Sequence, residues 1–467
     1  MSETTSNDQL KELRISLETS RLDDFKRIAE ELHYADLADF YEDLSEGERS
    51  KFVEFSGAKL FAEVVPDIPD KLVEDAIEYF SLEGQHELLD ELHDDDLVDA
   101  LQDVSEGAKK RYLSLLDPED KKVTDALLKY GEETAGGRMT TRYGCVHHDM
   151  TVKDAIEELR GIEEETESLA RIFVIDDSGV LIGKIKLRQL AFNNWNTQLS
   201  EIMMPVKHQV LASVDQEEAM QTFVKYDMLS LPVVDEYDRL LGVITHDDAM
   251  EILEEESTED IEKMAGVSGE QSDATYLNTC VLEHFKRRFP WLLALAMLAI
   301  LSGYVMLQYH DILSNVYILA LYLPMVVAAG GNTGGQAATM VIRAMALGEL
   351  EKGTSKRVAW KETRLGAILG ALLGAFIGGI TFLLVPFLGD LVPPMPEGIS
   401  LGYFALTAAI SLMLQITTST FTGAMLPILA RRVAIDPAVV ASPAITTIVD
   451  VSGLVIYFTV ATAILPV

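Results

Sequence analysis

The sequence predicts a multidomain protein: an all-α, superhelical acidic N-terminal domain, an α/β tandem repeat and an all-α membrane domain of five transmembrane helices. Two observations support this prediction. Residues 1–275 carry 66 acidic and 27 basic residues, whereas the rest of the 467-residue chain carries 9 and 11. This nearly neutral part also contains five long apolar segments. We expect an N-terminal domain, a tandem pair, an acidic connecting helix and a membrane domain, at residues 1–133, 134–256, 257–289 and 290–467.

The composition excludes some classes of protein. With a net charge of −37, no nucleic-acid partner is expected, because Lys and Arg are the residues that bind phosphates. Cys145 and Cys280 are far apart in the sequence, which argues against a disulfide scaffold or a zinc site. The N-terminus MSETTSNDQLKEL has no apolar core, so no cleavable signal peptide is expected. We therefore expect the acidic part to lie in the cytoplasm.

The N-terminal part, up to residue 133, has the pattern of consecutive helices. Apolar residues recur at spacings of three and four, and short polar breaks separate the periods. The phrase LHYADLADF at 32–40 recurs as LHDDDLVDA at 92–100. Recurring helical phrases predict a stacked, superhelical domain. Taken alone, its acidic runs are first of all solvated helix faces and helix caps.

A second repeat follows and is stronger. Residues 171–190 match residues 230–249 at an offset of 59, and each copy reads as strand, turn and strand. A helix is predicted before each hairpin, beginning near Thr151 and near Gln216. The next stretch, 251–263, is a helix dense in Asp and Glu, whose carboxylates repel one another unless cations lie between them. A linker that ends in an amphipathic helix then reaches the membrane domain.

The apolar segments are each about long enough to span a bilayer. Lys and Arg cluster before the first, between the second and third, and between the fourth and fifth, whereas the other two connections have none. This positive-inside pattern predicts cytoplasmic N-terminal domains and an external C-terminus. An odd number of spans favours a homodimer with a path near its axis. The predicted spans are 291–309, 312–331, 365–388, 401–429 and 437–465.

Two phrases in these segments suggest an ion path. Asp450 is the only charged residue in the five segments, and a carboxylate at membrane depth is by default a candidate for an ion or proton path. Thr446 and Thr447 lie on the same helix face. In the phrase GGNTGGQ (330–336) four glycines make an uninterrupted helix unexpected, and irregular backbone could line a cavity. The oxygen-bearing side chains of this phrase are Asn332, Thr333 and Gln336.

Structural alternatives remain open for both phrases. Asp450 could be bound to neighbouring helix hydroxyls, and the glycines could serve close helix packing, as we expect for Gly366, Gly370 and Gly374. Oxygen ligands with one carboxylate per chain select for hard cations. Mg²⁺ is usually held by one or two carboxylates and keeps several waters, so this set suits Mg²⁺ better than Ca²⁺ without deciding the ion.

The tandem repeat resembles a pair of CBS domains, a regulatory module that often binds adenine nucleotides. In that family a Gly-x-x-Thr-x-x-Asp phrase holds the ribose. GVITHDD supplies Gly242, Thr245 and Asp248 in this register. The first copy has Lys186 and Gln189 instead, so at most one good ribose site per chain is implied. From spacing alone, Asp248 could equally cap the next helix.

The whole chain resembles the MgtE family of magnesium channels, through the order of its parts and through GGNTGGQ and DPAVVASPAITTIVDVSG (436–453). The resemblance implies a homodimeric, Mg²⁺-selective channel in the inner membrane, surrounded by lipid, with Asp450 as the pore carboxylate and Asn332 beside it. It also implies closure when Mg²⁺ binds acidic cytosolic residues. Those implied regulatory ligands are Asp95, Asp99, Asp215, Glu217, Asp227, Asp248, Glu251, Glu256, Glu259, Asp260 and Asp436.

Other functions remain to be weighed. A proton- or sodium-coupled carrier would use Asp450 as a relay, and such carriers often contain inverted repeats, which the five segments do not show. A membrane-anchored sensor would leave Asp450 and GGNTGGQ without a role. An enzyme is least expected, because no nucleophile–base pair, Walker phrase or metal-type histidine spacing occurs, and His147–His148 is expected in a surface loop. The sequence leaves open whether Mn²⁺, Co²⁺ or Ni²⁺ also pass and whether ATP binds.

Overall fold

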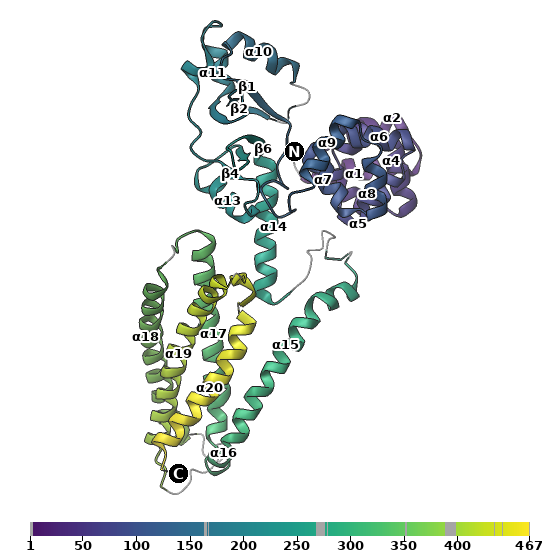
Figure 1. Ribbon diagram of the computed structural model, residues 1–467. Coiled ribbons are helices and arrows are strands. Elements are labelled where there is room, and N and C mark those ends of the chain that lie inside the picture. Colours follow the sequence, from purple (N-terminus) through teal and green to yellow (C-terminus); the bar gives the residue numbers. More distant parts are fainter. Residues whose placement is uncertain are drawn as a thin grey trace. The chain divides into compact units, whose positions relative to one another are not determined.

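The computed structural model describes residues 3–162, 166, 168–267, 276–277, 279–350, 353–387, 398–433, 435–440 and 442–466. The chain divides into two compact units, Met1–Glu254 and Glu255–Val467 (Figure 1).

The first unit begins with a purely helical domain whose buried core is rich in Phe, Leu and Tyr. Both copies of the repeated phrase lie at the start of a helix, with His33 and His93 as the N-cap residues. The predicted all-α domain is confirmed. Its elements are α1 (Glu3–Glu18), α2 (Leu22–Ala29), α3 (Tyr34–Glu42), α4 (Glu46–Ala62), the 3₁₀ turn η1 (Val65–Asp67), α5 (Asp70–Glu78), α6 (Leu82–Glu91), α7 (Asp94–Asp103), α8 (Glu106–Leu113) and α9 (Pro118–Leu127).

The second part of this unit contains two small sheets of the same topology. In each sheet the first strand pairs parallel with the second, and the second pairs antiparallel with the third. The first repeat comprises β1 (Tyr143–His147), α10 (Val152–Gly161), β2 (Ser168–Ile175), β3 (Leu181–Ile185) and α11 (Leu187–Phe192). After α12 (Leu199–Ile202), the second comprises β4 (Val210–Leu211), α13 (Gln216–Lys225), β5 (Leu231–Val234), β6 (Leu240–Ile244) and α14 (His246–Ala265).

The hairpin turns explain why the two repeats match in sequence. Asp176 Oδ1 accepts hydrogen bonds from the backbone amides of Ser178 and Val180, at 2.8 and 3.0 Å. Asp235 Oδ1 does the same for Tyr237 and Arg239, at 2.8 and 2.9 Å. An aspartate that binds its own turn is a common way to reverse a chain. The predicted strand–turn–strand units are confirmed.

The second unit is a helical bundle (Figure 1). It consists of the end of α14, α15 (Val281–Gln308), α16 (His310–Asn315), α17 (Leu319–Ala346), α18 (Ser355–Leu384), the 3₁₀ turn η3 (Val385–Phe387), α19 (Leu401–Arg432), the 3₁₀ turn η5 (Pro437–Val440) and α20 (Ser442–Ile464). Within the described ranges, four segments are long and apolar enough to cross a membrane: α15, α18 with η3, α19, and η5 with α20. The second of the five predicted spans, 312–331, is not confirmed by this criterion. Its helix, α17, has 28 residues but carries the polar phrase GGNTGGQ.

The expectation of an interrupted backbone at GGNTGGQ is wrong, because α17 runs through it as one helix. The glycines instead allow neighbouring helices to approach. A Cβ on Gly331 would lie 3.0 Å from the Thr446 side chain, and one on Gly334 would lie 2.7 Å from Ser419 Oγ. The glycines of α18 serve the same purpose: a Cβ on Gly370 would lie 2.7 Å from the Met413 carbonyl oxygen of α19. Small residues at such crossings let helix backbones pack closely.

Candidate functional site

Asp450 lies in the middle of α20, in the bundle. Its Oδ1 atom is buried and has no hydrogen-bond partner among the residues that the structure describes. The alternative in which helix hydroxyls bind this oxygen is therefore not realised within those residues. A buried carboxylate oxygen without a partner is costly unless water or a cation satisfies it. This atom can therefore interact with water or with a cation.

A three-helix junction holds this part of α20 in place. The Gln415 side chain of α19 donates from Nε2 to the Val449 carbonyl at 2.9 Å and packs on Gly330 of α17 and Gly453 of α20. Ser419 Oγ donates to the Gly330 carbonyl. Buried polar side chains that bridge helices fix their positions. The sequence offers Gln415 and Ser419 only as polar residues of the fourth predicted span. The structure shows that Gln415 links this helix to α20 and that Ser419 links it to α17.

The predicted oxygen ligands divide into two groups. Asn332 and Gln336 are exposed and lie one turn apart, on the same face of α17. The hydroxyls of Thr333 and Thr447 instead donate to carbonyls of their own helices, Ala329 at 2.9 Å and Pro443 at 3.0 Å. Thr446 lies against Gly331. The amide groups of Asn332 and Gln336 are thus exposed on the surface of the single chain, where they can bind a ligand or a partner.

In the first unit, the acidic residues of α7 face arginines that follow α9. Asp99 pairs with Arg138 at 3.4 Å, and Asp94 pairs with Arg142 at 3.6 Å. Asp95 is buried, with 8% of its surface exposed. Asp94 is not among the predicted regulatory residues. Its ion pair with Arg142 links the start of α7 to the segment that follows α9.

Other predicted regulatory residues lie on or beside α13 and α14. Asp215 is the N-cap of α13 and accepts a hydrogen bond from the Glu217 amide at 2.9 Å. Asp227, with a φ of 47°, follows the end of the same helix and is exposed. On α14, Glu251 is exposed and Glu256 is half-buried.

The second unit brings three of the predicted carboxylates together around a lysine. Lys263 Nζ lies 2.8 Å from the Asp436 carboxylate and also contacts Glu259, one turn earlier on α14. Burial raises the pKa of Asp260, and the negative charges of Asp436 and Glu259 raise it further, against the opposing effect of Lys263. Although burial alone would lower the pKa of Lys263, its hydrogen bonds to Asp436 and Glu259 raise it above its usual value. The three carboxylates of Glu259, Asp260 and Asp436 would attract a cation. Lys263 already neutralises part of their negative charge.

The residues expected at a ribose form a helix cap. Asp248 accepts hydrogen bonds from the Thr245 amide at 3.1 Å and from its hydroxyl at 2.6 Å. Burial raises the pKa of the Asp248 carboxyl, against the lowering effect of these two bonds. In the first repeat, Gln189 Oε1 accepts from the Lys186 amide at 3.0 Å in the equivalent place. Gly242 is needed for packing, since a Cβ there would lie 2.7 Å from the Thr140 carbonyl oxygen. The capping alternative is therefore realised, and a nucleotide would have to share these groups.

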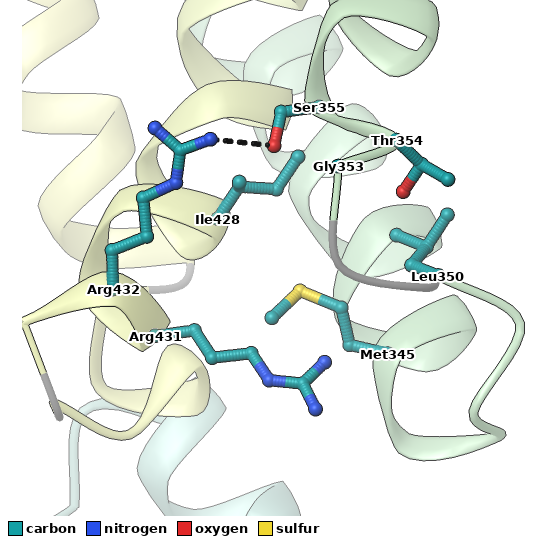
Figure 2. A pocket seen from close by; sticks show the side chains of 8 residues that line it. All are labelled: Met345, Leu350, Gly353, Thr354, Ser355, Ile428, Arg431 and Arg432. Atoms are coloured by element: carbon teal, nitrogen blue, oxygen red, sulfur yellow. Dashed lines mark hydrogen bonds between the residues drawn. The ribbon is translucent and has the colours of Figure 1, made fainter.

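The bundle contains a cavity of about 360 Å³. Figure 2 shows the residues that line it: Met345, Leu350, Gly353, Thr354, Ser355, Ile428, Arg431 and Arg432. Two arginines line it, and Arg432 donates to Ser355 Oγ at 3.0 Å. Guanidinium groups repel cations, so this cavity does not suit a cation path.

Comparison with known proteins agrees with this organisation. Residues 323–460 match the family model described as MgtE, divalent cation transporter, residues 32–133 match the MgtE intracellular N domain, and residues 135–192 and 199–255 match CBS domains. A magnesium transporter MgtE from Thermus thermophilus is 35% identical over 79% of both chains, and one from Bacillus subtilis is 28% identical over 96% of both. A crystal structure described as the cytosolic domain of the Mg²⁺ channel MgtE in complex with ATP is 32% identical, with a TM-score of 0.50, and covers 52% of this chain and 99% of that one.

Proposed function

Because the chain belongs to the MgtE family of magnesium transporters, which is not a family of enzymes, we propose that it is a homodimeric, Mg²⁺-selective channel of the inner membrane. Mg²⁺ is the cargo. The N-terminal domains face the cytoplasm and the C-terminus lies outside, as the distribution of Lys and Arg supports.

The observation that supports this function most directly is the buried, unpartnered Oδ1 of Asp450 within the described bundle. Mg²⁺ holds its water tightly and is commonly bound through one or two carboxylates. In the proposed channel, Asp450 attracts the hydrated ion, and the Gln415 junction holds α20 so that the carboxylate keeps its place. Two such carboxylates, one from each protomer, would form the selective ring.

Two exposed amide side chains support the dimer. Asn332 and Gln336 point away from their own chain on a helix whose other face packs against α19 and α20. Amide groups exposed to hydrocarbon are unfavourable. A partner protomer or a water-filled path between two protomers would cover this face.

The proposed gate closes when cytosolic Mg²⁺ binds the acidic residues. In the second unit, Glu259, Asp260 and Asp436 would hold a regulatory ion, and the raised pKa of Asp260 supports an attraction for cations there. Mg²⁺ can favour the closed state only by binding it more tightly than the open state. ATP would bind at the second CBS repeat, around Thr245 and Asp248, where the relative's complex with ATP is the supporting comparison.

The test is Mg²⁺ flux into proteoliposomes that contain the full-length protein. Asp450→Asn should abolish the flux, whereas Asp311→Asn, at an exposed acidic residue of α16, should preserve it. Normal flux through the Asp450→Asn protein would refute the proposed role of this carboxylate. The alternative, a coupled carrier, requires that a proton or sodium gradient drive Mg²⁺ uptake. A Mg²⁺ flux that does not change with a proton or a sodium gradient would favour the channel.

A further inference from the structure

One cluster of metal-binding side chains lies outside the proposed path. It is formed at the edge of the first CBS repeat where β1 and β2 end. The two strands are parallel, and His147 pairs in register with Ile175. Parallel strands end at the same edge of a sheet, so the residues that follow them meet. The backbone amide of His148 donates to the Ile175 carbonyl at 3.1 Å and extends this pairing by one residue.

The side chains beyond this edge converge. His147 Nδ1 lies 3.1 Å from Asp149 Oδ1, and His147 Nε2 lies 3.6 Å from the carboxylate of Asp177, which follows β2. His147, His148 and Asp149 each offer a ligand atom within 4.8 Å of the others. The expectation of a surface loop for the histidine pair is wrong for His147, which is the last residue of β1, whereas His148 lies in the turn that follows.

His148 is available as a ligand. Its Nδ1 atom is buried, and it has no hydrogen-bond partner in the described part of the chain. A buried ring nitrogen without a partner costs free energy, and imidazole nitrogens are normally satisfied by hydrogen bonds or by metals. Asp149 and Asp177 remain open to solvent, with 71% and 89% of their side chains exposed, so an ion can enter.

We propose that one ring nitrogen of His147, together with His148 and Asp149, binds one divalent transition-metal ion per chain, with Zn²⁺ as the best-suited ion. Asp177 lies beside the other ring nitrogen of His147, where a carboxylate commonly orients a metal-binding histidine. Imidazole is a preferred ligand of Zn²⁺, Ni²⁺ and Cu²⁺, whereas Mg²⁺ prefers oxygen ligands in an octahedron. Ligand atoms at about 2.0–2.1 Å from a tetrahedral Zn²⁺ lie roughly 3.3 Å apart. The 3.1 Å between His147 Nδ1 and Asp149 Oδ1 is already close to this spacing. A water molecule would complete the four ligands.

The second repeat serves as an internal comparison. There Leu211 pairs with Val234, and the Ala212 amide donates to the Val234 carbonyl at 3.0 Å, in the places of His147 and His148. The next residue is Ser213, where the first repeat has Asp149. At the equivalent backbone positions the second repeat thus has Leu211, Ala212 and Ser213, which are not typical metal ligands. Only the first repeat has the ligands, so the fold alone does not require them.

The test uses full-length protein in detergent, titrated calorimetrically with Zn²⁺ in the presence of millimolar Mg²⁺, which saturates sites that prefer Mg²⁺. We expect one bound Zn²⁺ per chain. The variant His147→Gln/His148→Gln should bind it more weakly by at least the ~10–100-fold that loss of supporting groups around a metal costs. The matched control is His208→Gln, since the His208 ring stacks on Tyr226 with centroids 3.5 Å apart and belongs to the second repeat. Co²⁺ should give the intense visible absorption of a four-coordinate site in the wild type and the control.

Two results would overturn the proposal: no Zn²⁺ bound in the presence of Mg²⁺, or equal Zn²⁺ binding by the double variant. Mg²⁺ flux is measured in parallel and should be unchanged in the double variant, because these residues do not belong to the proposed path. An absence of Mg²⁺ flux in the wild type would contradict the proposed channel but not this site. An absence of Zn²⁺ binding would contradict this site but not the channel.

Discussion

The ammonium group of Lys263 lies 2.8 Å from the carboxylate of Asp436, at a place where a regulatory Mg²⁺ would also be attracted. Both side chains are about two-thirds covered, with 28% and 35% exposed. In the proposed gate, lysine and Mg²⁺ would compete for the same carboxylates. Lys263→Met should lower the Mg²⁺ concentration that half-closes the channel by about three- to tenfold, equivalent to ~0.7–1.4 kcal/mol. Inhibition of Mg²⁺ flux by Mg²⁺ on the cytosolic side measures this shift.

The matched control for this prediction is Lys286→Met, which removes an exposed lysine of α15. The control should leave the inhibitory concentration unchanged. A higher inhibitory concentration for Lys263→Met would mean that the lysine itself holds the closed arrangement together, and competition with Mg²⁺ would be ruled out.

The pH dependence of stability tests the surplus charge at Asp260. Its pKa is raised in the folded protein, so ionisation opposes folding, and this cost disappears as pH falls through the raised pKa. Asp260→Asn should therefore raise the thermal midpoint at neutral pH. The difference from wild type should shrink as pH falls through the raised pKa toward the ordinary aspartate range. Thermal unfolding of the purified protein across this range is the measurement.

Asp176→Asn offers a control of opposite sign. Hydrogen bonds from Ser178 and Val180 lower the pKa of Asp176, so its ionised form favours folding, and this benefit is lost as pH falls through the lowered pKa. This variant should be less stable than wild type at neutral pH. If both variants shifted the midpoint in the same direction, the charge at position 260 could not be the cause.

The sequence predicts the elements of the first unit well because their signals are local. The offset of 59 residues reappears in paired turns at Asp176 and Asp235 and in paired caps at Gln189 and Asp248. GGNTGGQ was misread for a physical reason. Glycine disfavours a helix in isolation. Here, however, α17 can pack closely against Thr446 and Ser419 only because the facing positions have no side chain. Such tertiary contacts leave no signal in the phrase itself.

At the candidate regulatory site, too, the sequence predicts individual residues but not their tertiary contacts. The carboxylates at 259, 260 and 436 stand out as acidic residues, and the structure brings them near one another. Lys263 does not stand out, because a lysine in an acidic helix is ordinary. Its role becomes visible only when Asp436, far along the chain, lies beside it. In the cluster at His147, the three ligands are adjacent in the sequence, but strand pairing brings Asp177 beside them, and spacing does not predict that contact.

The three-helix junction near Asp450 makes Gly330 a sensitive position. A Cβ there would collide with the Gln415 amide and lie 2.9 Å from the Val449 side chain. Gly330→Ala should displace Gln415 from the Val449 carbonyl and destabilise the protein by about 1–3 kcal/mol, as overpacking commonly does. The thermal midpoint and Mg²⁺ flux should both fall. Gly303→Ala, on α15 with no atom within 4 Å of the added Cβ, should leave the flux unchanged and should not lower the thermal midpoint. Equal behaviour of the two variants would contradict the junction.

The final prediction separates the two roles of Asp248. Gln189 already caps α11 with an amide oxygen, so Asp248→Gln should keep a cap on α14 while it removes the carboxylate that would bind a ribose. This variant should remain as stable as wild type, within about 0.5 kcal/mol, and lose ATP binding in a calorimetric titration. Gln189→Ala should show the opposite pattern: a loss of about 0.5–2 kcal/mol from the missing cap with ATP binding intact. Unchanged ATP affinity in Asp248→Gln would leave the helix cap as the only role of this side chain.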